Sequence, residues 1–238
     1  MTRPPAPAPG WRRMVAALSG AVTGVRTTEA VAALTFDDGP HPVYTPPLLD
    51  LLDRHAARAT FFLVGEAAAR HPALVREIAA RGHAVGNHSW SHPSFTMIPG
   101  GERRRQLHAC RRALAPYGAP LFRPPYGHHS VPARLDALWC GHEVIGWSHD
   151  SHDWCEADED VLADALERGI RPGSIVLLHD AIHDQGRPTL GPVLSRAAVL
   201  DRSATLAALD RVLRHIGDAM RFLTVPELLR HGPPVRQS

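Results

Sequence analysis

Short apolar runs alternate with amphipathic stretches from Val31 almost to the end of the chain, and this alternation constrains the fold more than any other feature of the sequence. The apolar runs are predicted to be strands at 31–36, 60–64, 83–86, 121–123, 143–147, 174–178 and 221–225. The stretches between them carry apolar residues at three- and four-residue intervals and are predicted to be helices at 47–55, 72–81, 102–115, 131–139, 158–168, 204–216 and 226–230. Such strand–helix repeats indicate a parallel sheet covered by helices.

The predicted strands have the composition of strands that are buried on both faces. The run at 175–178 is apolar throughout, as expected when helices cover one face of a parallel sheet and a packed interior covers the other. An open doubly wound sheet would show the same alternation, but the glycine fingerprint of dinucleotide-binding sheets is absent. Because 238 residues is an ordinary length for one α/β barrel, we predict a single barrel domain.

The two ends of the chain differ from this pattern. We divide the sequence into an arm at 1–28 with a possible surface helix, a domain at 29–231 and a flexible tail at 232–238. Residues 14–25 are mildly apolar, but they are too few to span a bilayer, which takes about 20 apolar residues. The segment at 30–32 resembles a signal-peptide cleavage site, but cleavage there would remove the start of the first predicted strand. We therefore expect a surface helix and a cytoplasmic protein, with secretion or attachment to the cell surface as the alternative.

Composition excludes several kinds of chemistry. All 26 basic residues are Arg, and the absence of Lys excludes Schiff-base catalysis, pyridoxal phosphate anchoring and the P-loop lysine. The three cysteines show no CxxC spacing, so they indicate neither a disulfide framework nor a structural zinc knuckle. The net charge is only +2, and the arginines at 103–105, 111 and 112 are interpreted as a solvated helix face, so we expect no nucleic-acid partner.

Unusual polar clusters follow one predicted strand after another, at the point where each strand ends. In an α/β barrel the reactive groups lie on the loops that leave these carboxyl ends. The five clusters are Thr-Phe-Asp-Asp-Gly-Pro at 35–40, His-Ser-Trp-Ser-His at 88–92, Arg-Pro-Pro-Tyr-Gly at 123–127, Asp-Ser-His-Asp-Trp at 150–154 and Leu-Leu-His-Asp at 177–180. Each taken alone has a structural explanation, such as a capped turn or a stiff loop. Five in order at strand ends indicate one functional site.

The first two clusters favour a metal site. Neighbouring carboxylates at a buried strand end repel one another unless a cation or base takes up their charge. Because neighbours in an extended segment point to opposite sides, one of Asp37 and Asp38 can bind a metal while the other addresses a water molecule or an arginine. Two imidazoles four residues apart, those of His88 and His92, complete a ligand set that leaves positions open for water and substrate.

The other clusters favour proton transfer and positioning. The prolines after Arg123 fix where its side chain departs, so that it can orient Asp37 through a charge-assisted hydrogen bond. His179 emerges from an apolar strand, where a nearby carboxylate would raise the pKa of its imidazole. The long segment at 181–203 is expected to wall the site.

In combination, the five clusters resemble the motifs of the polysaccharide deacetylase family, also called the NodB-homology domain or carbohydrate esterase family 4. The resemblance covers roughly residues 31–230 and implies an α/β fold, a distorted (β/α)7 barrel. It implies a role for each matching position. The implied metal ligands are Asp38, His88 and His92; the implied catalytic groups are Asp37 (general base), Arg123 (partner of Asp37), His179 (general acid) and Asp153 (which tunes His179); and the implied substrate groups are Tyr126 (backbone N–H to the oxyanion), Trp154 and Leu177 (acetyl pocket).

The resemblance also implies an activity. We predict a hydrolase that removes N-acetyl groups from amino sugars in an oligosaccharide, a cell-wall glycan or a glycoconjugate. Zinc is the expected divalent cofactor because imidazole and carboxylate suit it, although cobalt or nickel would fit the same ligands. The alternatives are deacylation of a small biosynthetic intermediate, O-acetyl ester hydrolysis and, in a different class, a carbohydrate-binding module without catalysis.

Overall fold

The computed structural model describes residues 10–183 and 200–238, so the predicted loop at 181–203 lies mostly outside the described residues. Its strands are β1 (Ala21–Val25), β2 (Val31–Asp37), β3 (Ala59–Leu63), β4 (Ala84–Asn87), β5 (Gly118–Phe122), β6 (Glu143–Val144), β7 (His149–Asp150), β8 (Ile175–His179), β9 (Arg221–Phe222) and β10 (Pro234–Gln237). Its helices are α1 (Trp11–Leu18), α2 (Thr45–Arg54), α3 (Gly65–Arg70), α4 (Pro72–Ala80), α5 (Gly100–Leu114), the 3-10 turn η1 (Pro125–Gly127), α6 (Val131–Trp139), α7 (Glu159–Gly169), α9 (Ser203–Ile216) and α10 (Val225–Leu228).

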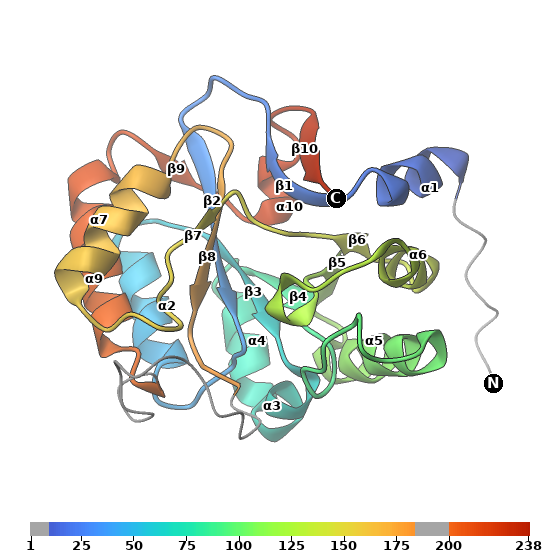
Figure 1. The fold of residues 1–238 in the computed structure, drawn as a ribbon. Helices are drawn as coiled ribbons and strands as arrows, with labels where there is room; N and C mark the ends of the chain where they lie inside the picture. Colours follow the sequence, from blue (N-terminus) through green and yellow to red (C-terminus); the bar gives the residue numbers. More distant parts are fainter. Residues whose placement is uncertain (1–9, 184–199) are drawn as a thin grey trace.

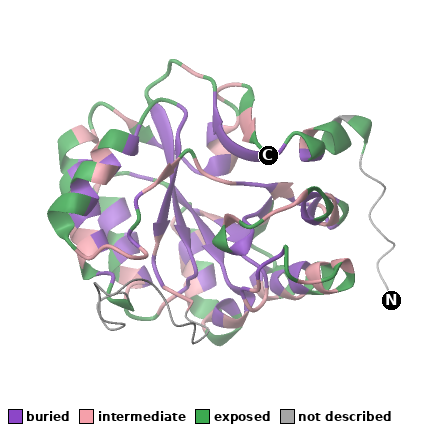
Figure 2. Ribbon diagram, viewed as in Figure 1, coloured by how far each residue is buried: buried purple, intermediate pink, exposed green. Residues whose placement is uncertain are grey.

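A curled parallel sheet forms the centre of the molecule, with helices around its outside (Figure 1). The strand order is β6-β5-β4-β3-β2-β8-β7, and each neighbouring pair in this path is parallel. This confirms the predicted fold class, a distorted barrel of seven parallel strands. The strands are mostly buried, whereas the helices expose one side to solvent (Figure 2).

The continuous apolar run of β2 packs into two separate cores. Leu34 and Phe36 point toward the helices, where they pack in one cluster with leucines of α2, α7 and α9. Val31 and Ala33 point into the barrel and pack with Phe62 of β3. Because successive side chains of a strand face opposite sides, both halves of the run need apolar residues.

One predicted barrel strand is not in the barrel path. The run at 221–225 pairs only with the start of β2, through Val31 opposite Arg221 and Ala32 opposite Phe222. It ends there because Thr224 caps α10 in a capping box with Glu227. The seventh position belongs to β7, a strand of two residues that was not predicted.

The two chain ends correct the predicted arm and tail. The expected surface helix exists as α1, but Ala21–Val25 is a buried strand, because Gly20 at a φ of +121° turns the chain out of the helix. The expectation that 232–238 is flexible is wrong, because β10 pairs antiparallel with β1. Within the described ranges, no helix combines the length and apolarity that a bilayer crossing requires.

Strand β1 lies across the open seam of the barrel, next to the end of β6 on one side and the start of β8 on the other. It makes a parallel bridge from Val22 to Ile145 and an antiparallel bridge from Gly24 to Ser174. The Gly146 N–H donates to the Val22 carbonyl at 2.8 Å, and this contact takes the chain out of the sheet soon after β6. The predicted strand at 143–147 is therefore shortened to two residues.

The close contact between β1 and the segment before β8 predicts that a side chain at Gly24 destabilises the fold. A Cβ there would lie 2.7 Å from the Gly173 carbonyl oxygen. We expect Gly24→Ala to lower the free energy of unfolding by about 1–3 kcal/mol in urea titration, because two backbones would have to separate. Gly101→Ala is the matched control, because no atom lies within 4 Å of the added methyl group. Equal urea midpoints for the two variants would contradict the close approach of Gly24 to the Gly173 carbonyl.

Candidate active site

The carboxyl ends of neighbouring strands bring the five clusters together. Asp37, the last residue of β2, lies beside His179, the last residue of β8. On the other side, Asn87 at the end of β4 lies beside Phe122 of β5, so the His88 and Arg123 clusters leave the sheet as neighbours. The predicted site therefore forms at one mouth of the barrel.

The side chains of Asp38, His88 and His92 form a buried triad. One ligand atom from each lies within 4.8 Å of the others. His92 Nε2 is 3.2 Å and His88 Nε2 is 3.4 Å from Asp38 Oδ1. Asp38 and His92 have φ values of +74° and +58°, a costly conformation that the surrounding loops must hold.

The chemistry of this triad fits a divalent cation. Asp38 Oδ1 is buried and has no hydrogen-bond partner among the described residues. Burial alone would raise the pKa of Asp38, but His92 and His88 hold it well below its usual range, so the carboxylate is ionised. The Nδ1–H of His88 donates to the Arg123 carbonyl at 2.8 Å, which leaves Nε2 as the ring nitrogen that faces Asp38. The other carboxylate oxygen of Asp38 accepts the His183 N–H at 2.8 Å. These three residues could hold a metal ion.

Asp37 is held by the fully buried guanidinium of Arg123. Nη1 of Arg123 donates to Asp37 Oδ1 at 2.8 Å and to Thr35 Oγ1 at 2.7 Å, and Nη2 donates to the Gly146 carbonyl at 2.8 Å. Its Cζ lies 4.3 Å from the centroid of the Phe62 ring. Burial lowers the pKa of Arg123, and the Asp37 carboxylate opposes that change, so the guanidinium stays charged. Asp37 Oδ2 faces the triad, 3.7 Å from His88 Nε2.

The buried Asp153 and the partly buried His179 form a pair on the other side of the mouth. The Nδ1–H of His179 donates to Asp153 Oδ1 at 2.8 Å, and its backbone N–H donates to Oδ2 at 2.8 Å. Burial alone would lower the pKa of His179, but Asp153, with smaller contributions from Asp38 and Asp37, raises it to about 9. The imidazole is therefore protonated at neutral pH, and Nε2 is its remaining donor atom.

Two residues that support Asp153 were not predicted. Arg202 is fully buried, and its Nη1 donates to the Asp153 carbonyl at 2.6 Å and lies 3.8 Å from Oδ2. Thr205 Oγ1 donates to the same Oδ2 at 3.4 Å. Both lie about 50 positions from Asp153 in the sequence, and nothing in their spacing indicates the contact.

Asp180 supports the loop of the first cluster. Its Oδ2 accepts the Thr45 hydroxyl at 2.5 Å, and a Cβ added to Gly39 would lie 2.3 Å from the same oxygen. Burial, with the nearby Asp38, raises the pKa of Asp180 to about 7, against the effect of Thr45. Gly39 is therefore required for the close packing of this carboxyl against the metal-ligand loop.

The three predicted substrate residues lie around the same mouth. Tyr126 adopts a φ of +59° in η1, and its ring centroid lies 4.6 Å from that of His92. Leu177 precedes His179 by two residues in β8, so both side chains leave the same face of the strand. Trp154 is half-buried directly after Asp153. Their roles in binding an acyl group stay predictions.

The fold and the site together define an α/β-barrel hydrolase with a candidate metal centre. The family model described as polysaccharide deacetylase matches residues 24–145, and this chain belongs to that family. The predicted enzyme class, a hydrolase of carbon–nitrogen bonds other than peptide bonds, is confirmed.

Individual relatives match most of the chain. It is 37% identical over 189 residues to a chitooligosaccharide deacetylase of Sinorhizobium fredii, covering 78% of this chain and 85% of the relative. It is 32% identical over 212 residues to a peptidoglycan-N-acetylglucosamine deacetylase of Bacillus cereus, covering 87% and 92%. Among solved structures, the Bc1960 peptidoglycan N-acetylglucosamine deacetylase superposes with a TM-score of 0.77 at 29% identity, covering 93% of this chain and 96% of that one.

The triad geometry predicts metal binding that depends on each ligand. We expect zinc to bind the purified protein and, at a hundredfold excess over its Kd, to stabilise the fold by about 2.7 kcal/mol. His88→Ala should abolish both effects, because two protein ligands hold zinc poorly. Elemental analysis and thermal unfolding are the measurements. His215→Ala, on the exposed side of α9, is the control and should bind zinc normally; retention of zinc by His88→Ala would refute the triad.

Proposed function

We propose that this chain removes the acetyl group from the nitrogen of N-acetylated hexosamines in oligosaccharides or cell-wall glycans. One observation carries the proposal: a single mouth combines an oriented carboxylate at Asp37, a cation-binding triad that includes Asp38 and a protonated imidazole at His179. Amide hydrolysis needs these three kinds of group together. The names of the chitooligosaccharide and peptidoglycan deacetylases among its relatives support this class of substrate.

Asp38, His88 and His92 would hold the cation, and zinc is the proposed ion, with cobalt or nickel as alternatives. A divalent cation at this position lowers the pKa of water and polarises the acyl carbonyl. Imidazole nitrogens and a carboxylate oxygen are ligand atoms that such an ion takes in proteins.

Asp37 acts as the general base in this proposal. It accepts the proton of the water that attacks the carbonyl carbon, through the oxygen that Arg123 does not bind. Arg123 holds the carboxylate in one orientation, and its burial among Thr35, Phe62 and Gly146 keeps that orientation fixed. The proton thus leaves the nucleophile as the new carbon–oxygen bond forms.

His179 acts as the general acid. Its Nδ1–H is committed to Asp153, so the Nε2–H is the proton that can be given to the departing nitrogen. Protonation converts the poor amide leaving group into a neutral amine, and the carbon–nitrogen bond breaks to release acetate and the free amino sugar. Arg202 and Thr205 keep Asp153 in place during this step.

Acetate release is the direct test of the proposal. The zinc-loaded protein is incubated with chitooligosaccharides and with acetylated muropeptides, and acetate is quantified. We expect release from at least one of these glycans. A matched pair of amide and O-acetyl ester substrates separates the proposed amidase from an esterase through kcat/KM. No release across the whole panel would refute the proposed substrate class.

The assignment of the base predicts the behaviour of Asp37→Ala. We expect kcat to fall by about two to four orders of magnitude, because proton transfer from water is lost. Bound zinc should stay stoichiometric, since the other three side chains supply the ligand atoms. Activity close to that of the unchanged protein would contradict the role of Asp37.

The assignment of the acid predicts an alkaline limit to activity. Because Asp153 raises the pKa of His179, the acid is protonated at low pH and is lost as pH rises toward about 9. A cation bound beside Asp38 offsets part of the upward effect of the carboxylates on the pKa of His179. The activity of the metal-loaded enzyme should therefore begin to fall at a pH below about 9. Asp153→Asn removes the largest upward contribution and should move the limb of the kcat profile to lower pH by about one unit or more. An unmoved limb would show that another group sets it.

A further inference from the structure

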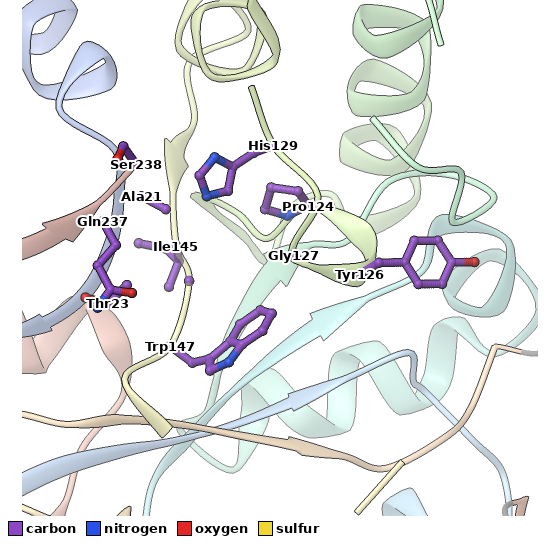
Figure 3. Close-up of a pocket in the computed structure, with 11 residues that line it drawn as sticks. Ala21, Thr23, Pro124, Tyr126, Gly127, His129, Ile145, Trp147, Gln237 and Ser238 are labelled. Atoms are coloured by element: carbon purple, nitrogen blue, oxygen red, sulfur yellow. The ribbon is translucent and has the colours of Figure 1, made fainter. Parts of the chain in front are cut away.

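A cavity lies beside the proposed catalytic mouth and is not used by the proposed mechanism. Its volume is about 260 Å³, and it lies between the β1–β10 pair and the segment at 124–129 (Figure 3). The Tyr126 side chain points away from it, and the ring of that residue contacts His92. Loop 124–127 thus separates the cavity, which we call the seam cavity, from the metal-binding triad.

The wall of the seam cavity between the two sites is stiff. Pro124 and Pro125 precede the left-handed Tyr126, and Gly127 at a φ of +65° packs against the Trp147 ring. A Cβ at Gly127 would lie 2.5 Å from that ring. The seam cavity and the catalytic mouth are therefore held at a fixed separation, as neighbouring subsites for one rigid chain would require.

Some side chains that line the seam cavity are polar, and none of the lining side chains is charged. Thr23 contributes a hydroxyl group, Gln237 an amide and His129 an imidazole. The Nδ1 of His129 accepts a hydrogen bond from Arg134 Nη1 at 2.8 Å, so its Nε2 carries the hydrogen and is a donor. Burial and Arg134 lower the pKa of His129, which keeps the ring neutral.

Apolar surface completes the lining. The ring of Trp147 provides a flat face and Pro124 and Ile145 add aliphatic surface, while Thr23, His129 and Gln237 can supply hydrogen bonds around them. Faces of this kind bind the C–H side of a pyranose, and the polar rim binds its hydroxyl groups. A charged ligand would find no opposite charge among these side chains.

We propose that the seam cavity is a saccharide subsite that holds one neutral pyranose ring of the glycan whose acetamido group lies at the triad. The proposal rests on the proposed function, since the glycan must cross loop 124–127 between the two sites. Such a subsite makes the enzyme selective for oligomers over single sugars, because only an oligomer reaches both the triad and the seam cavity.

Two variants test the subsite without touching the proposed catalytic groups. Thr23→Val keeps the shape but removes the hydroxyl group, and Gln237→Trp places a bulky ring at the exposed rim. Thr28→Val, an exposed position on the loop after β1, is the matched control. Each protein is assayed for kcat/KM on chitotetraose and on 4-nitrophenyl acetate, which is too small to span both sites.

We expect Thr23→Val to lower kcat/KM on chitotetraose by about three- to tenfold, the effect of one lost hydrogen bond, and Gln237→Trp to lower it further. Both variants should match the control on 4-nitrophenyl acetate. Unchanged values on chitotetraose overturn the subsite while leaving the proposed function in place. An equal loss on both substrates also overturns it, because the substitution then acts through the catalytic mouth.

A binding measurement separates the subsite from the proposed function. Calorimetric titration of chitotriose into the metal-free protein should give a weaker Kd for Gln237→Trp than for Thr28→Val. If no acetate is released from any glycan, the proposed function fails and this titration still decides the subsite. Equal Kd values for the two variants, or no binding to either, overturn the assignment of the cavity.

Discussion

The buried guanidinium of Arg123 is the interaction on which the rest of the site depends. It joins β2, through Thr35 and Asp37, to the segment after β6, through the Gly146 carbonyl. Its own carbonyl accepts the Nδ1–H of His88, so the same residue orients one proposed metal ligand and the proposed base. A fully buried charge is costly unless it is paired and hydrogen-bonded, and this one obtains its ion pair and its hydrogen bonds through Nη1 and Nη2 only when β2 and the segment after β6 are in place. Folding of the barrel and assembly of the site are therefore coupled.

On each side of the mouth, a side chain of opposite charge holds the proposed catalytic group in place. On one side an arginine fixes a carboxylate, and on the other a carboxylate, Asp153, fixes an imidazole. Each fixed group has one atom outside these hydrogen bonds: Asp37 Oδ2, which faces the triad, and His179 Nε2. Asp153 raises the pKa of His179, so that side can donate a proton, while the carboxylate oriented by Arg123 is the proposed acceptor on the other side.

Much of this site could be predicted because its residues lie within a few positions of strand ends. Asp37, His88, Arg123 and His179 each follow an apolar run, and parallel strands carry such residues to one edge whatever the loops do. Arg202 could not be predicted in the same way, because its contact with Asp153 depends on how α9 packs. The run at 221–225 had the composition of a barrel strand, but the capping box at Thr224 ended it after two residues. The polar tail at 232–238 had the composition of a frayed end, and only the unpaired edge of β1 made it a strand.

The pairing of β1 with β10 has a consequence for the order of folding. Ala21 lies opposite Gln237, so the strand that closes the barrel is completed by a contact between residues 216 positions apart. Long-range pairing forms late, because the entropy cost of closing a large loop comes before the stabilising contacts of the strand pair. During synthesis the seam of the nascent barrel stays without this support until residues 234–237 have left the ribosome. Over that interval the edge of β1 is open to pairing with other chains, so β10 also protects this strand from misassembly.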